Sequence, residues 1–158
     1  MGRLFDAVSA LLGICTRVSY EGQAAIELEA ATVPSDRVFY PFNLDVTNVP
    51  WTVDPREIVR GVLDDLRAGT SKGSIATRFH NTIVELIRAV CVVARRERGL
   101  ATVVLSGGCF QNMFLLEHAT ARLKRAGFDV RHHRLVPAND GGISLGQAVV
   151  ALAKMRDS

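Results

Sequence analysis

The last third of the chain contains two runs that are able to form strands, and each is followed by a loop with paired glycines and then by a helix. The first run, Thr102–Leu105, is β-branched and continuous, which is typical of a strand buried on both faces of a sheet. We expect a helix over residues 113–125, a second strand over 128–132 and a last helix over 142–155. This order predicts parallel strands joined by a right-handed crossover, and therefore an α/β unit.

The first two thirds of the chain are predominantly helical. Amphipathic or helix-favouring patterns predict helices over residues 4–12, 23–31, 55–67 and 74–98. Asp54 and Pro55 mark the third start, as an N-cap carboxylate and a first-turn proline. Between residues 33 and 51 we expect a loop with short extended pieces, such as Val38–Phe42. The simplest interpretation is one domain over residues 1–158, with a helical first part and an α/β second part.

Composition excludes several classes of protein. The 158 residues include 19 basic and 16 acidic side chains that are largely interspersed, and aromatic residues make up only 6%, so a nucleic-acid surface is not expected. The three cysteines lie far apart and form no CxxC pair, which predicts neither a zinc knuckle nor a disulfide framework. The apolar stretches are far shorter than the ~20 residues of a membrane span. We therefore expect a cytoplasmic protein without membrane or nucleic-acid partners.

Two loops at the predicted sheet edge are candidate binding elements. Gly107 and Gly108 allow the backbone to approach an anion, and Asn112 near the next helix start is able to donate to a phosphate or a ribose. Asp140, in the sequence Asn-Asp-Gly-Gly, is able to cap a helix or to bind a cation. The alternative is ordinary turn chemistry at both loops, with Asn112 as an N-cap. Two such loops on one edge favour a nucleotide cleft.

Other polar residues give weaker signals. Asp6 lies among apolar neighbours on a helix, and Glu27 lies on the next helix, where solvated carboxylates are the usual explanation. His80 and His118 are on helices without a histidine or acidic partner one turn away, so surface or internally satisfied imidazoles are expected. Cys109 is interpreted as a small packed residue rather than a nucleophile, because no histidine is close to it in the sequence.

Five segments together resemble the C-terminal part of the HypF-type carbamoyltransferases of [NiFe]-hydrogenase maturation. They are GRLFDAVSALLGI (2–14), YEGQAAIELEA (20–30), RFHNTIVELI (78–87), LSGGCFQNMFLLE (105–117) and VPANDGGISLGQAVVA (136–151). The tRNA threonylcarbamoyladenosine synthases share the Gly-Gly…Asn skeleton but not the full wording of the last two segments.

The resemblance implies an actin/hexokinase-like (ASKHA) lobe with nucleotide in a cleft between two lobes. It also implies a divalent metal, which is iron, zinc or magnesium, bound by Asp140. No catalytic residue is assigned. The residues that it implies for binding ATP or carbamoyl-adenylate are Gly107, Gly108, Asn112, Asp6, Gly22, Gln23 and Glu27.

The implied reaction uses carbamoyl phosphate and ATP to form carbamoyl-adenylate, and then transfers the carbamoyl group to the C-terminal cysteine of a HypE-type acceptor. The N-terminal lobe, with its paired-histidine metal ligands, and the adenylating domain of the family have no counterpart in these 158 residues. We therefore expect one lobe of a longer enzyme, inactive by itself. The alternatives are an O-carbamoyltransferase of the same superfamily, a non-catalytic docking module and, more distantly, a sugar kinase.

Overall fold

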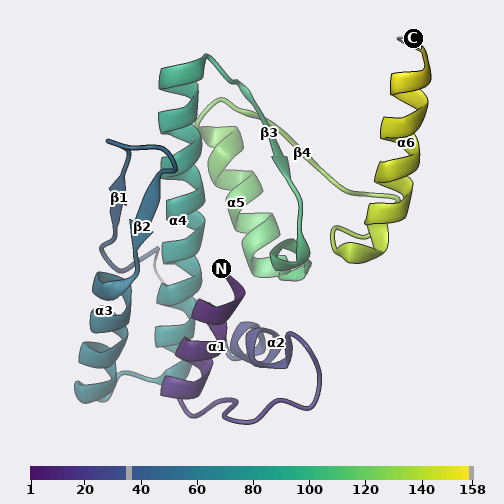
Figure 1. The fold of residues 1–158 in the computed structure, drawn as a ribbon. Coiled ribbons are helices and arrows are strands. Elements are labelled where there is room, and N and C mark those ends of the chain that lie inside the picture. The colour runs from purple at the N-terminus through teal and green to yellow at the C-terminus, as the bar shows by residue number, and fades with distance from the viewer. Residues whose placement is uncertain (35–36, 157–158) are drawn as a thin grey trace.

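The computed structural model describes residues 1–34 and 37–156, and it has a helical first part followed by an α/β second part (Figure 1). The first part contains α1 (Gly2–Leu11), α2 (Gln23–Ala30), β1 (Asn43–Asp45), β2 (Thr52–Asp54), α3 (Arg56–Arg67) and α4 (Lys72–Arg98). The second contains β3 (Thr102–Leu105), the 3-10 turn η1 (Gly108–Gln111), α5 (Met113–Arg125), β4 (Asp129–His132), the 3-10 turn η2 (Asp140–Gly142) and α6 (Ile143–Arg156).

Most helices begin and end within two residues of the predicted positions, and capping contacts are present at several of these ends. The Asn112 Oδ1 atom accepts a hydrogen bond from the Leu115 N–H at 2.8 Å, so the N-cap expected at α5 is present. Gly99 and Gly127, predicted to end α4 and α5, have φ of 70° and 78°, a conformation that glycine adopts without steric cost. The Asp54 carboxylate accepts from the Arg56 N–H at 3.0 Å at the start of α3.

The extended piece expected at residues 38–42 was placed wrongly. That segment lies along α4, where the Tyr40 N–H donates to Thr82 Oγ1 at 2.8 Å and the Asn81 side chain donates to the Val38 carbonyl at 3.1 Å. These bonds use the backbone groups that a strand would need. The hairpin forms immediately afterwards, with β1 and β2 antiparallel. Residues 35 and 36 of the predicted loop lie outside the described part of the chain.

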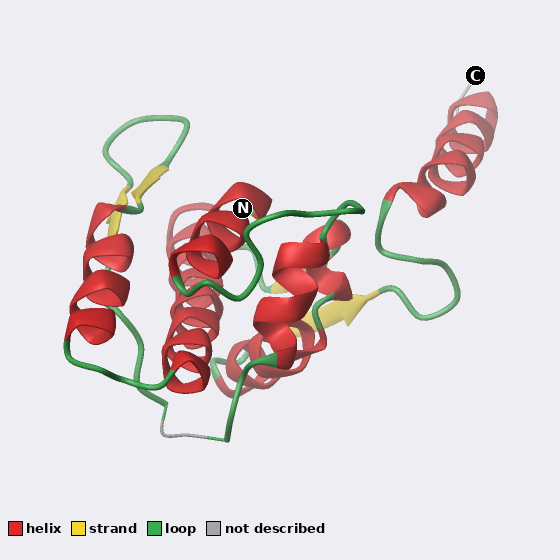
Figure 2. Ribbon diagram, turned by 90° about the horizontal axis from the view of Figure 1, so that it is seen from below, coloured by secondary structure: helices red, strands yellow, loops and turns green. Residues whose placement is uncertain are grey.

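The core has two parts joined by α4 and α5. The larger part lies among α1, α2, α3 and the first half of α4, and includes Leu28, Val62 and Phe79. The smaller part lies between α5 and the sheet, around Leu105, Leu123 and Phe128. Figure 2 shows these layers from below, with α6 standing apart from both. Within the described residues, no helix is both long and apolar enough to span a membrane.

The strands β3 and β4 are parallel, as predicted, with Leu105 opposite His132. The expectation that β3 is buried on both faces was wrong. The Leu105 side chain is buried beside α5, whereas 66% of Val104 is exposed on the opposite face. The reason is that α4 and α5 pack against one face of the two strands, and α6 does not cover the other (Figure 1).

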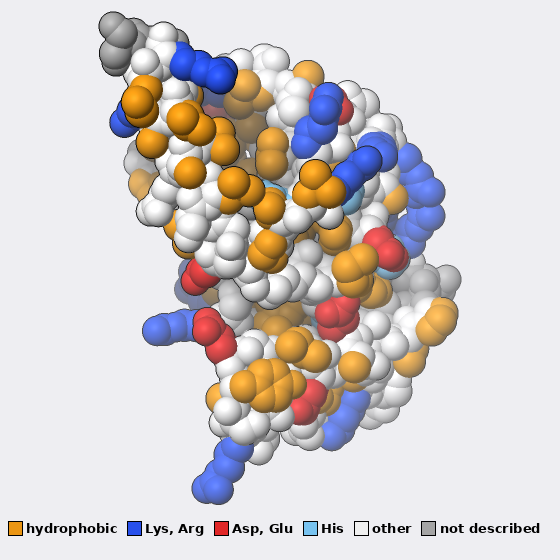
Figure 3. Space-filling view, turned by 90° about the vertical axis from the view of Figure 1, so that its right-hand side faces the viewer, with side chains coloured by type: hydrophobic (Ala, Val, Ile, Leu, Met, Phe, Trp, Pro, Cys, Tyr) orange, Lys and Arg blue, Asp and Glu red, His pale blue; other side chains and the backbone are white. Residues whose placement is uncertain are grey.

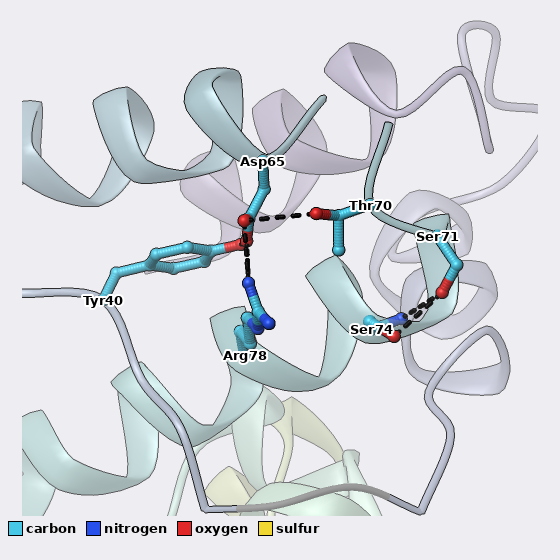
Figure 4. A network of polar contacts seen from close by, with 6 residues as sticks. All are labelled: Tyr40, Asp65, Thr70, Ser71, Ser74 and Arg78. Atoms are coloured by element: carbon cyan, nitrogen blue, oxygen red, sulfur yellow. Dashed lines mark hydrogen bonds and ion pairs between the residues drawn. The ribbon is translucent and has the colours of Figure 1, made fainter. Parts of the chain in front are cut away.

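A polar network joins α3 to α4 at the edge of the larger core (Figure 4). The Asp65 carboxylate accepts from the Tyr40 hydroxyl at 2.6 Å and from Arg78 Nη1 at 2.7 Å to each oxygen. The Thr70 hydroxyl donates to the same carboxylate at 3.3 Å. Burial alone would raise the pKa of Asp65, but the hydrogen bonds from Tyr40 and Arg78 hold it below its usual value.

Candidate functional site

The two glycine loops meet at the carboxyl edge of the sheet. The Gly107 N–H, which follows β3, donates to the Ala138 carbonyl, which follows β4, at 2.9 Å. Gly107 has φ of 98°, so this position requires glycine. A Cβ at Gly107 or Gly108 would have no atom within 4 Å, which leaves the space beside this backbone open. The predicted juxtaposition of the loops is therefore confirmed.

A pocket of about 290 Å³ lies between the first two helices and the turn that precedes α5. It is lined by Gly2, Phe5, Glu21, Gly22, Ala25, Ile26, Glu29, Gly108, Cys109, Gln111 and Asn112. The lining contains two carboxylates and no lysine or arginine. Such a wall suits a neutral ligand group that donates hydrogen bonds, such as a sugar hydroxyl, better than it suits a phosphate.

Asn112 is held at the pocket wall by two hydrogen bonds. Its carbonyl oxygen caps α5, and its Nδ2 atom lies 3.0 Å from His80 Nε2. His80 is fully buried on α4, and its Nδ1 atom lies 2.8 Å from the Ala76 carbonyl. Burial lowers the pKa of His80 to about 4, against the opposing effect of the Ala76 carbonyl, so the ring is neutral at physiological pH.

Glu29 connects the opposite wall to the same helix start. Its Oε1 atom accepts a hydrogen bond from the Phe114 N–H at 3.0 Å. A carboxylate at this position satisfies one free N–H of the first turn of α5 and interacts favourably with the helix dipole. The Phe114 ring in turn stacks on His118, with the ring centroids 4.0 Å apart. Glu29 therefore connects α2 to the start of α5 and also lines the pocket.

Three of the residues implied for nucleotide binding are brought together in this pocket, namely Gly22, Gly108 and Asn112. Gly107 is the residue just before the lining segment. Asp6 is exposed on α1 and lies outside the lining. Their contact with a nucleotide stays a prediction.

Gln23 and Glu27 lie on a different face of α2 from the lining residues. Gln23 Nε2 donates to Glu27 Oε1 at 2.7 Å, and Gln23 Oε1 accepts from the Ser19 N–H at 2.7 Å. The pair therefore stabilises the entry to α2. It is Ala25, Ile26 and Glu29 of this helix that face the pocket, as expected for positions three to four residues apart.

Asp140 is exposed in η2, and Asn139 before it accepts a hydrogen bond from the Gly141 N–H at 3.1 Å. That bond is ordinary turn chemistry. In the described part of the chain, no three His, Cys, Asp or Glu side chains are grouped so that they could hold a metal ion. A single exposed carboxylate does not fit a transition metal, which takes about four ligands. Among residues 1–34 and 37–156, the side chains therefore do not make a metal centre by themselves.

Sequence reasoning missed His80 and Glu29 as parts of the site. Their partners are 32 and 85 residues away, so no local pattern connects them. Only the apolar setting of His80, between Phe79 and Ile83 on the buried face of α4, indicated that its ring would be internal.

Comparison with known proteins identifies the family. A family model described as "Carbamoyltransferase, Kae1-like Domain, second subdomain" matches residues 1–147. The chain is also 39% identical, over 96% of its own length, to the carbamoyltransferase HypF of Synechocystis. The chain belongs to the HypF carbamoyltransferase family. HypF of Rhodobacter capsulatus is 40% identical over 99% of the chain.

A crystal structure of full-length HypF in the phosphate- and nucleotide-bound form has the same fold, with a TM-score of 0.91 and 44% identity over 96% of this chain. The expected fold class, an ASKHA-type α/β lobe with helices first and parallel strands later, is therefore confirmed. The chain spans 20% of the length of that protein, and 19% and 20% of the Synechocystis and Rhodobacter proteins.

Proposed function

We propose that this chain forms one wall of the nucleotide site of a HypF-type carbamoyltransferase, and that its pocket binds the adenosine part of ATP and of carbamoyl-adenylate. The observation that carries the proposal is the pocket itself, where the glycine loop after β3 and the Asn112 amide face α2. The similar full-length protein was crystallised with phosphate and nucleotide, which supports a nucleotide as the ligand class.

The lining favours a particular orientation of the ligand. Glu21 and Glu29 are suited to accept hydrogen bonds from ribose hydroxyls, and the apolar Phe5 and Ile26 are suited to contact a base. The phosphates then lie toward Gly107 and Gly108, where no side chain blocks the backbone.

In the proposed reaction, the thiolate of the C-terminal cysteine of a HypE-type acceptor attacks the carbamoyl carbon of carbamoyl-adenylate, and AMP leaves. The adenylate forms when water cleaves the phosphate from carbamoyl phosphate and the resulting carbamate attacks the α-phosphorus of ATP, releasing pyrophosphate. These 158 residues bind and orient the nucleotide. In this proposal the other wall, the metal ligands and the adenylating domain are supplied from outside these 158 residues, which span about a fifth of the length of the full-length relatives. We accordingly expect the 158-residue chain to bind nucleotide without transferring carbamoyl groups.

Calorimetric titration of the chain with AMP tests the proposal. The Asn112→Ser variant keeps an N-cap oxygen for α5 but loses the amide donor, and we expect its Kd for AMP to rise about tenfold, the value of one hydrogen bond. Asn48→Ser, in the exposed β1–β2 loop, is the matched control and leaves the Kd unchanged. Absence of AMP binding by the unmodified chain, or equal Kd values for both variants, contradicts the proposal and favours a docking module.

A further inference from the structure

The hydrogen-bonding capacity of Asn112 is only partly used. A side-chain amide has two N–H donors and two lone pairs on its oxygen. The oxygen accepts from the Leu115 N–H, and one N–H is directed at His80 Nε2. One N–H of the amide group is thus left for another acceptor, and Asn112 lines the pocket.

The tautomer of His80 decides which way this amide points. The Ala76 carbonyl only accepts hydrogen bonds, so Nδ1, at 2.8 Å from it, carries the ring proton. Nε2 is then a bare acceptor, and it is 3.0 Å from the Asn112 nitrogen. An amide rotated by 180° would place its oxygen against this lone pair and its nitrogen against the Leu115 N–H, losing both bonds. Only one orientation of the amide satisfies both neighbours.

Packing fixes the imidazole ring itself. Phe5 lies edge-on to it with the centroids 5.4 Å apart, and the Phe114 ring is tilted against it with the centroids 5.1 Å apart. Aromatic neighbours at these distances restrict rotation of a buried ring. Residues of α1, α4 and α5 together therefore hold the His80 ring in place, and the ring in turn holds the Asn112 amide.

We propose that His80 is a positioning residue, which does not line the pocket itself but holds the Asn112 amide so that its second N–H points at the ligand. The proposal rests on the proposed nucleotide site and adds the residue that orients its amide donor. The preset orientation removes part of the conformational entropy that ordering Asn112 would otherwise cost on binding. The neutral state of His80 is consistent with this role, because a proton on Nε2 would oppose the Asn112 N–H.

Two substitutions at the same position separate the two contacts of the ring. His80→Asn places an amide nitrogen near Nδ1 and keeps the bond to the Ala76 carbonyl, but it is too short to reach Asn112. His80→Gln is longer and is able to place its oxygen near Nε2, which restores an acceptor for Asn112. His118→Asn is the matched control, because His118 makes the same contact with the carbonyl four residues earlier, at 2.9 Å, but is exposed and outside the pocket lining.

The first measurement needs no variant. Long-range ¹H–¹⁵N spectra of the unmodified chain are expected to show His80 with its proton on Nδ1, and a single slowly exchanging set of Asn112 side-chain N–H₂ signals. A proton on Nε2 overturns the proposal even if every variant fails to fold. So do Asn112 signals averaged by rapid 180° flips of the whole amide group.

The second measurement is AMP affinity. We expect His80→Asn to raise the Kd about tenfold and to shift the Asn112 N–H₂ signals, while His80→Gln stays within about threefold of the parent and His118→Asn is unchanged. Equal affinities for His80→Asn and the parent overturn the proposal. If the parent itself does not bind AMP, the nucleotide function fails, and the Asn112 signals of the two His80 variants still decide whether the ring positions the amide.

Discussion

The His80 imidazole makes folding stability depend on pH, because it is buried without charge. Its pKa is about 4 in the folded chain and near 6.5 when unfolded, so the unfolded chain binds more protons between these values. Stability from this group is complete above pH 6.5 and is lost as the pH falls toward 4. The difference between the two pKa values corresponds to about 3 kcal/mol of folding stability, all of which is lost well below pH 4.

The prediction concerns the free energy of unfolding measured by urea titration at pH 7.0 and pH 4.5. His80→Gln removes the titrating group, so its loss of stability between the two pH values is expected to be about 2 kcal/mol smaller than that of the parent chain. Because carboxylates titrate equally in both proteins, the difference isolates the imidazole. Identical losses would mean that the ring is solvated in the folded state.

The contrast between Asn112 and His80 shows what sequence reveals at this scale. Asn112 was identified because its cap partner, Leu115, is three residues away and the preceding glycines mark the turn. His80 acts on a residue 32 positions later, and only the packing of α4 against α5 brings the two together. The local cap could be predicted, whereas the contact between His80 and Asn112, which forms only when α4 packs against α5, could not.

Among the elements, α3 and α4 are joined by the Asp65 carboxylate, which is hydrogen-bonded to both Tyr40 and Arg78 (Figure 4). Asp65→Ala leaves the half-buried guanidinium of Arg78 without its carboxylate and the Tyr40 hydroxyl without its acceptor. We expect this variant to lose about 2–4 kcal/mol of stability, measured by chemical denaturation at pH 7.

Asp64→Ala is the matched control for this experiment. Asp64 is adjacent in α3 and pairs with Arg67 at 3.2 Å, but 62% and 75% of the two side chains are exposed. Solvent-exposed pairs contribute little, so the change is expected to stay within about 0.5 kcal/mol. Similar losses for both variants would show that the Asp65 network contributes no more to stability than an exposed ion pair does.

The helices of this region were predictable because residues that favour a helix start or end lie at their ends, such as Asp54-Pro55 before α3 and Gly99 after α4. The short strands β1 and β2 were not, since strands of three residues carry almost no periodic signal. The segment just before β1 is hydrogen-bonded to α4, from the Tyr40 N–H to Thr82 Oγ1.

At the scale of the whole molecule, the second part leaves apolar surface open on one side. Figure 3 shows hydrophobic side chains gathered over α6, which has no buried residue. The exposed apolar side chains of this helix are Ile143, Leu145, Val149, Val150, Leu152 and Met155. The helix was predicted from its composition. Whether its apolar side chains are covered depends on another protein segment packing against them. The same holds for Val104 on the open face of β3.

Because helix stability in proteins comes mostly from packing, α6 should be the least stable helix of the chain. Its 14 residues are near the length at which isolated helices are marginal in water. In hydrogen exchange at pH 7, we expect amides of α6 to exchange at least about a hundredfold faster than those in the buried half of α4, where Ile75, Phe79 and Ile83 are inaccessible to solvent.

Two leucine substitutions test in a second way whether the side chains of α6 are uncovered. Leu123 in α5 is completely buried, so Leu123→Ala is expected to cost about 2–4 kcal/mol, whereas Leu152 in α6 is 59% exposed and Leu152→Ala should cost less than about 0.5 kcal/mol. The reverse ranking, or strong amide protection in α6, would show that α6 is covered in solution, for instance by a second copy of the chain. Sedimentation at several concentrations would then separate self-association from a rearranged monomer, because only the former changes with protein concentration.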